Sequence, residues 1–186
     1  MATSFVTEAS EDIRCSYLNV FKARLNDLSG NEEYSSQLLI PKSANKTLKD
    51  IKSACDEALA NKFAGKVPAS AKKSPLRDGE EPDADGNERA ECYAGHWFCN
   101  VKNSNRPGVV DENVQPIIDS SEFTSGDYVR VSLNAYAYDN KGNKGVALGL
   151  SNIQRVRKGE PLGNVQRAES VFDVLETTDA NFDPLA

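Results

Sequence analysis

The chain has one histidine, one tryptophan and one methionine, and no apolar run near the roughly 20 residues that cross a bilayer. Residues 1–10 lack the basic stretch and apolar core of a secretory signal, so we expect a cytoplasmic protein. A single histidine leaves little scope for histidine acid–base catalysis. The motifs G-x-x-x-x-G-K-[ST], G-x-S-x-G and H-E-x-x-H are also absent. These absences favour a protein that is not an enzyme.

The cysteines lack the CxxC spacing, and no HxxxH pair provides the other common ligand spacing of a structural zinc site. They are interpreted as packed thiols of a reducing compartment: Cys15, Cys55, Cys92 and Cys99. Zinc near His96 and calcium at residues 83–87 are the alternatives, although the latter lacks the closing glutamate of an EF-hand. We expect no metal and no cofactor.

Basic residues are not in excess, since 22 lysines and arginines face 28 acids and the net charge is −6. The acids are concentrated in two blocks. Residues 78–91 contain seven acids and one arginine, and residues 168–186 contain five acids and no base. Residues 1–77 carry twelve bases against nine acids, and residues 92–167 carry nine against seven. Most of the chain is therefore mildly basic, and its net charge does not exclude a nucleic-acid partner.

The apolar pattern predicts strands at residues 13–25, 34–40, 96–102, 128–138 and 146–156. One helix is predicted at residues 47–64, where Thr47 with Asp50 resembles a capping box. Residues 66–91 have little apolar content and are expected to form a long mobile loop. This order favours a mainly β protein with an OB-fold Greek-key barrel and one inserted helix over residues 1–167, although periodicity also allows a sandwich.

The clearest candidate site is the predicted strand from Tyr128 to Tyr138. Alternation places its valines, leucine and alanines on a core face. The opposite face presents three rings, a cation and small polar groups: Tyr128, Arg130, Ser132, Asn134, Tyr136 and Tyr138. Rings stack on unpaired bases and cations contact phosphates, so this face is typical of single-strand nucleic-acid binders. The alternative is a solvent-facing strand whose tyrosines pack on neighbouring strands or on a second subunit of a homodimer.

Neighbouring segments extend this candidate surface. The next strand carries small residues, including Gly149, on one face, and these allow close approach of a ligand. The candidate nucleic-acid-binding set is completed by one ring and several cations: Phe98, Lys102, Arg155, Arg157, Lys73 and Arg77.

Two other functions stay open from the residues alone. The acids of residues 78–91 could hold the metal of a nuclease, although a flexible loop does not provide the rigid geometry that metal catalysis requires. The tyrosine face could instead be the interface of a protein–protein adaptor.

Residues 168–186 are expected to be a disordered acidic tail. A polyanion with aromatic rings can compete with DNA for a basic face and can dock partner proteins. The candidate partner-binding residues of this tail are Phe172, Asp173, Glu176, Asp179, Phe182 and Asp183.

Three segments resemble a family of bacteriophage single-stranded DNA-binding proteins: Ser125–Tyr138, Gly142–Gly145 and Leu148–Val156. Shorter matching pieces lie at Leu39–Lys42, Leu76–Gly79 and Pro107–Asp111. That family is similar in fold and tail design to the replication single-strand binders of short-tailed phages. The resemblance implies an OB fold and sequence-tolerant binding of single-stranded DNA. It also implies a role in phage DNA replication, recombination or repair in the host bacterial cytoplasm, with phage or host replication proteins as partners of the tail.

Overall fold

The computed structural model describes residues 3–27 and 29–162. The elements of that part of the chain are β1 (Thr3–Val6), η1 (Ala9–Glu11), β2 (Arg14–Leu25), β3 (Glu32–Pro41), α1 (Asn45–Lys62), β4 (Arg77–Asp78), η2 (Glu91–Tyr93), β5 (His96–Asn103), β6 (Gly108–Val110), η3 (Ser120–Glu122), β7 (Tyr128–Asn140) and β8 (Asn143–Arg157). The predicted helix and the five predicted strands are present, and β1, β4 and β6 are additional short strands. The acidic tail expected at residues 168–186 lies outside the described residues.

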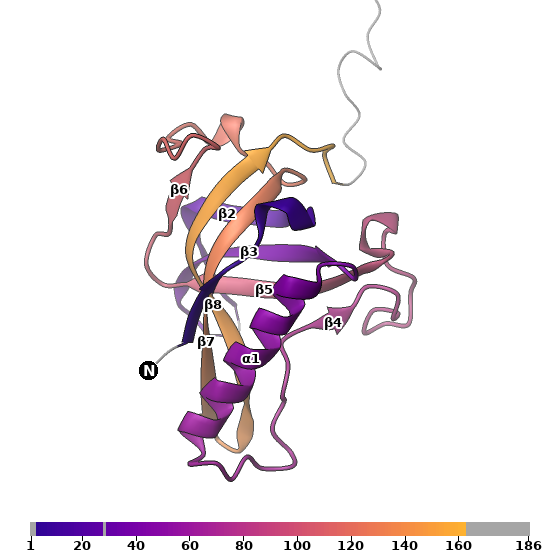
Figure 1. Ribbon diagram of the computed structural model, residues 1–186, viewed down its shortest axis with the longest axis vertical. Helices are drawn as coiled ribbons and strands as arrows, with labels where there is room; N and C mark the ends of the chain where they lie inside the picture. The colour runs from indigo at the N-terminus through magenta and orange to yellow at the C-terminus, as the bar shows by residue number, and fades with distance from the viewer. Residues whose placement is uncertain (1–2, 28, 163–186) are drawn as a thin grey trace, which may run out of the picture.

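Five of the strands close into a barrel. β2 pairs antiparallel with β3, and β3 pairs antiparallel with β5. β5 then runs parallel to β8, which pairs antiparallel with β7. The ring closes through the pair of Arg14 and Tyr128 between β2 and β7. The expected mainly β architecture of an OB-type Greek-key barrel with one helix is therefore confirmed (Figure 1).

Alternation along the barrel strands places the core. Every second residue of β7 from Val129 to Ala135 is at most 1% exposed, and Val146, Leu148 and Leu150 of β8 also point inward. A slip of one residue would turn all of these side chains to solvent. Because each buried aliphatic side chain contributes about 1.5–3 kcal/mol, the core fixes the register and thereby decides which side chains face outward.

Helix α1 lies beside the β7–β8 hairpin (Figure 1). Its first turn is capped from outside the helix, because the Glu11 carboxylate accepts hydrogen bonds from the backbone N–H groups of Lys46 at 2.9 Å and Thr47 at 3.0 Å. The predicted capping box at Thr47 is therefore wrong, since Thr47 is already helical and a carboxylate 36 residues away occupies the cap position. Within the described residues, no helix is long and apolar enough to cross a membrane.

The segment expected to be a long loop is tied to the barrel at several points. Lys72 forms a bridge with Gly145 of β8, and β4 pairs Arg77 with Phe98 of β5. The Asp78 carboxylate lies 2.8 Å from the ammonium group of Lys42. The expected long loop therefore contains one short strand, β4, because the edge of β5 at Trp97 and Phe98 accepts it.

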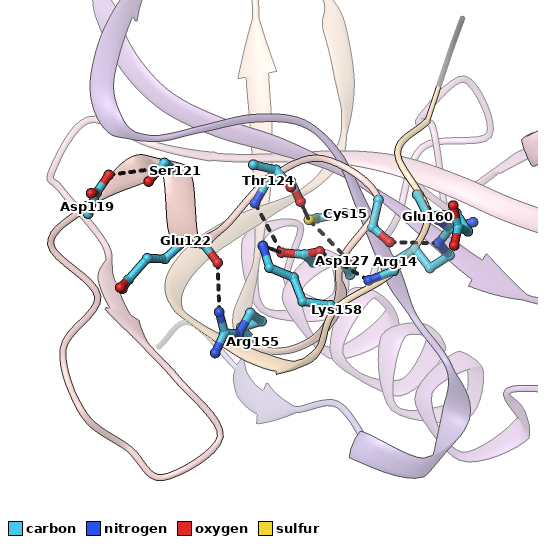
Figure 2. Close-up of polar contacts among 12 residues, drawn as sticks. Arg14, Cys15, Asp119, Ser121, Glu122, Thr124, Asp127, Arg155, Lys158 and Glu160 are labelled. Atoms are coloured by element: carbon cyan, nitrogen blue, oxygen red, sulfur yellow. Dashed lines mark hydrogen bonds and ion pairs between the residues drawn. The ribbon is translucent and has the colours of Figure 1, made fainter. Parts of the chain in front are cut away.

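A polar cluster holds the last described residues against the barrel (Figure 2). Asp127 is 1% exposed, and its carboxylate accepts hydrogen bonds from Lys158 Nζ at 3.0 Å and from the backbone N–H of Gly159 at 3.1 Å. Arg14 donates to the backbone carbonyl of Glu160. A buried carboxylate must be paired to be tolerated, so Asp127 fixes the path of the chain beside Arg14.

Candidate nucleic-acid interface

The outer face of β3 and β5 forms the floor of an open groove. The register pairs Gln37 with Asn100 and Ser35 with Lys102, and alternation turns these four side chains away from the core. Together with residues of β2, including Tyr17, they line a cavity of about 450 Å³. This is the face of the second and third barrel strands, which in OB folds binds oligonucleotides and oligosaccharides.

A second cavity, of about 570 Å³, continues this groove onto the β7–β8 hairpin. Glu33 and Lys102 line both cavities, and Tyr136 and Asn134 line the second. Gly149 lies against Asn134, because a Cβ atom added at this glycine would lie 2.5 Å from the Asn134 Oδ1 atom. The name "groove" is used below for these two connected cavities, which run from Tyr17 to Tyr136.

Tyr17 stands at one end of the groove in a strained backbone conformation. Its φ is 47°, within the left-handed region, at an irregularity in the pairing of β2 with β3. That conformation costs an L-residue about 1–2 kcal/mol and is often kept where a site requires it. The residue is 67% exposed, so its ring face is available to a ligand.

Tyr93 of η2 brings a second ring to the same face. Its hydroxyl donates a hydrogen bond of 2.6 Å to the Gln37 Oε1 atom, and the guanidinium of Arg89 lies 5.9 Å from its ring centroid. Burial, followed by the neighbouring Tyr17 and Cys92, raises the pKa of Tyr93. The hydroxyl therefore stays protonated at neutral pH and acts as a hydrogen-bond donor.

Phe98 lies on the outer face of β5 but is covered. It is 1% exposed, with the guanidinium groups of Arg77 and Arg89 at 4.5 and 4.7 Å from its ring centroid. The ring of Tyr93 packs against it edge-on at 5.1 Å. The expectation that Phe98 stacks on bases is therefore corrected, because β4 and η2 fold over its ring. The exposed side chain above it is Arg77.

Lys102 lies where the two cavities meet. Its ammonium is 3.0 and 3.1 Å from the two carboxylate oxygens of Glu33. Burial acts in the opposite direction, but hydrogen bonds from Asn26 and Lys102 lower the pKa of Glu33. The Lys102 side chain is 40% exposed, and such a pair contributes little to stability. A phosphate can therefore compete with Glu33 for this cation.

The tyrosines of β7 do not form one stack. Tyr136 lines the groove with Lys102, so the structure brings these two expected residues together. Tyr138 lies over Gly145, where an added Cβ atom would come within 2.7 Å of the tyrosine hydroxyl. Tyr128 is eight residues from Tyr136, or about 26 Å along an extended strand.

Tyr128 belongs to a separate cationic cluster. The guanidinium of Arg157 lies 3.7 Å from its ring centroid and that of Arg14 lies 5.2 Å from it. Arg157 also pairs with Asp12 at 2.8 Å. The three residues Arg14, Tyr128 and Arg157 are called the Tyr128 stack below.

Three other expected cations lie outside the groove. Arg155 donates to the backbone carbonyl of Glu122 at 2.7 Å and to the Glu112 carboxylate at 2.9 Å (Figure 2 shows the first bond). Its side chain is 17% exposed. Instead of the expected phosphate contact, Arg155 joins β8 to η3 and to the loop that contains Glu112. Arg130 is exposed beside β1, and Lys73 lines an apolar cavity against α1.

Several acids of residues 78–91 are paired within the chain rather than gathered around one point. Asp78 and Glu80 both pair with Lys42, and Asp83 accepts hydrogen bonds from two backbone N–H groups of its own turn. Across residues 3–27 and 29–162, no group of three or more histidine, cysteine, aspartate or glutamate side chains is placed to hold a metal ion.

Sequence reasoning missed most of the groove. The missed residues that line it are Tyr17, Arg24, Gln37 and Asn100, and Tyr93 and Arg89, which lie beside it, were missed as well. Strict alternation from the buried Cys15 would turn the Tyr17 side chain inward. The left-handed backbone conformation of Tyr17 turns it outward instead. The available signal was the preference of OB-fold ligands for the second and third barrel strands.

Comparison with known proteins gives two sequence matches. A family model described as the ssDNA-binding protein of Enterobacter phage Enc34 matches residues 4–183. Protein p50 of Acyrthosiphon pisum secondary endosymbiont phage 1 is 30% identical over 175 residues, which cover 88% of this chain and 91% of that protein.

Solved structures with a similar fold include two of phage single-stranded DNA-binding proteins. One is the single-stranded DNA-binding protein from bacteriophage Enc34 in complex with ssDNA, with a TM-score of 0.68, 24% identity and coverage of 82% of this chain and 87% of that one. The other is gp2.5, a single-stranded DNA-binding protein encoded by bacteriophage T7, with a TM-score of 0.58, 16% identity and coverage of 98% and 100%. Both similarities support the OB-like fold.

Proposed function

This chain belongs to the family of phage single-stranded DNA-binding proteins represented in phage Enc34, and we propose that it binds single-stranded DNA in the groove between Tyr17 and Tyr136. The family consists of non-catalytic binding proteins. The observation that carries the proposal is the groove itself. Exposed or half-exposed tyrosine rings stand at both ends, and a cation held only by a weak surface pair lies between them.

Stacking on the tyrosine rings would supply the sequence-tolerant part of the affinity. Tyr17 and Tyr136 occupy opposite ends of the groove, and Tyr93 lies over its floor. Base–aromatic stacking contributes about 1–3 kcal/mol per base and accepts every base, because each base has a π face. Double-stranded DNA keeps its bases stacked on one another, so the same rings would discriminate against it.

The phosphates would be held by cations around the groove. Arg24 and Lys102 line it, and Arg77 and Arg89 lie over Phe98 next to it. Arg89 donates to the backbone carbonyls of residues 81 and 82, so these hydrogen bonds position the guanidinium without neutralising its charge. If Z phosphates are neutralised, log affinity should fall against log salt with a slope of roughly −0.7Z.

The acidic tail would compete with DNA for the cations of the barrel surface, which include those of the Tyr128 stack. Near the end of the described residues, the backbone carbonyl of Glu160 accepts a hydrogen bond from Arg14 of the Tyr128 stack. Residues 168–186 therefore come shortly after a residue that lies beside cations. They carry five acids and two phenylalanines, Phe172 and Phe182. A tethered polyanion acts at high effective concentration, and DNA that displaces the tail would free it to dock replication proteins.

The same proposal places the protein in phage DNA replication, recombination or repair within the infected bacterium. There it would coat and protect single strands without cutting them. The tail would recruit phage or host replication proteins to the coated strand. Binding in the groove would account for the coating, and docking by the tail residues would account for the recruitment of partners.

The test is a salt-titrated binding assay on a single-stranded oligonucleotide and its duplex. We expect preference for the single strand, a negative salt slope and weaker binding by Tyr136→Ala, which removes the ring at one end of the groove. Tyr138→Ala is the matched control on the same strand, because its ring lies over Gly145 rather than in the groove. Equal affinity for both DNA forms, or an unaffected Tyr136→Ala protein, would refute the proposal.

A further inference from the structure

The floor of the groove contains a chain of oriented hydrogen bonds. The Tyr93 hydroxyl donates to the Gln37 Oε1 atom at 2.6 Å, and the Gln37 Nε2 group donates to the Asn100 Oδ1 atom at 3.1 Å. Gln37 is 8% exposed and directly opposite Asn100 across β3 and β5. Each bond sets the orientation of the next amide.

The consequence is a fixed pair of donors at Asn100. Its Oδ1 atom faces Gln37, so its NH₂ group is the part of the amide left for a ligand. Among the described residues that NH₂ group has no hydrogen-bond partner, and the residue is exposed in the cavity that Tyr17 also lines. A base stacked on Tyr17 would therefore present its edge to donors.

We propose that Asn100 is a specificity-determining residue of the groove. At the position beside Tyr17 it favours bases with a keto oxygen at pyrimidine C4 or purine C6 (thymine and guanine) over bases with an amino group at that atom (cytosine and adenine). Thymine O4 and guanine O6 accept hydrogen bonds, whereas cytosine N4 and adenine N6 are donors that would face the Asn100 NH₂ group. This inference rests on the proposed binding of single-stranded DNA in the groove.

Gln37 and Tyr93 are positioning residues in this account. Without the Tyr93 hydroxyl the Gln37 amide can rotate, and Asn100 can then turn its own oxygen to the ligand. One hydrogen bond gained or lost is worth about 2- to 10-fold in affinity. The groove is therefore expected to bind all sequences, with a graded preference rather than a strict code.

The experiment measures the ratio of affinities of the full-length protein for oligothymidine and oligodeoxycytidine of equal length at neutral pH. Both bases are pyrimidines of one ring size, and they differ in the group at C4, in the proton on N3 and in the thymine methyl group. A change of the ratio in Asn100→Asp assigns the preference to the Asn100 amide rather than to the methyl group. We expect wild-type protein to favour oligothymidine by about 2- to 10-fold. Asn100→Asp, which replaces the donors by a carboxylate, should lower or invert the ratio, and Tyr93→Phe should lower it.

Ser35→Asp is the matched control, because it adds the same charge to the same cavity away from the amide chain. It should weaken both affinities and leave their ratio unchanged. A wild-type ratio near one, or an unchanged ratio in Asn100→Asp, overturns the inference. If Tyr17→Ala and Tyr136→Ala still weaken binding in that case, the proposed function stands. If Tyr136→Ala does not weaken binding, the proposed function fails with it.

Discussion

Replacing Tyr17 by glycine separates binding from folding more cleanly than any other substitution in the groove. Glycine removes the ring, which should weaken single-strand binding by about 1–3 kcal/mol, or about 5- to 150-fold in Kd. It also accepts a φ of 47° and so relieves about 1–2 kcal/mol of backbone strain. The greater entropy of glycine in the unfolded chain opposes this gain by about 0.5–1 kcal/mol. The free energy of unfolding should therefore change little.

The assay pairs fluorescence anisotropy on a labelled oligothymidine with urea denaturation of the free protein. Ile118→Ala is the control, because Ile118 is 84% exposed and lies outside the groove, so both quantities should keep their wild-type values. Wild-type affinity in Tyr17→Gly would refute stacking at this end of the groove. A loss of several kcal/mol of stability would show instead that the ring has a structural role.

The remaining predictions concern the covered ring, the helix cap, the thiols and the tail. Phe98→Ala should lose about 3–5 kcal/mol of unfolding free energy in urea, because its ring is buried beneath two guanidinium groups. Glu11→Gln should cost about 0.5–2 kcal/mol at pH 7. Although burial opposes it, hydrogen bonding lowers the pKa of Glu11 in the folded protein. The stability that the Glu11 carboxylate contributes is therefore present above the unfolded-state pKa and is lost as the pH falls through the lower folded-state pKa. The unfolding free energies of wild-type and Glu11→Gln protein should converge when they are measured at decreasing pH. When the native protein is treated with a thiol reagent, Cys92 should be modified first, whereas Cys99, whose pKa burial raises to about 12, should be modified only on unfolding. Mass spectrometry of the modified peptides checks this order. Deleting residues 168–186 should tighten single-strand binding, and more at about 50 mM than at about 300 mM salt, because salt screens the competition between tail and DNA. Equal affinities of the full-length and truncated proteins at both salt concentrations would show that the tail does not compete with DNA.

The barrel could be predicted from the sequence because its strands obey simple alternation. Val129, Val131 and Leu133 are buried as expected, and the outward face of β7 carries the expected tyrosines. The same rule correctly placed Phe98 outside the barrel. It could not show that η2 folds back over that ring, since a cover supplied by a distant loop leaves no periodic trace in the strand itself.

The groove could not be predicted from the sequence, because it depends on features that the local residue pattern does not encode. The irregularity at Tyr17 reverses the direction of one side chain in β2, and the hydrogen bond from Tyr93 joins a loop to β3 across 56 residues. The predicted phosphate contact of Arg155 was wrong for a related reason, because the acceptors of its hydrogen bonds lie 33 and 43 residues away in the chain. A basic cluster in sequence says nothing of which of its members find acceptors within the fold.

We propose above that single-stranded DNA lies in the groove between Tyr17 and Tyr136. Photocrosslinking of full-length protein to an oligonucleotide that contains 5-iododeoxyuridine, followed by mapping of the crosslinked peptides, tests it directly. We expect crosslinks at Tyr17, Tyr93 and Tyr136. Crosslinks confined to the Tyr128 stack, or to Tyr138 and the helix side of the hairpin, would contradict it.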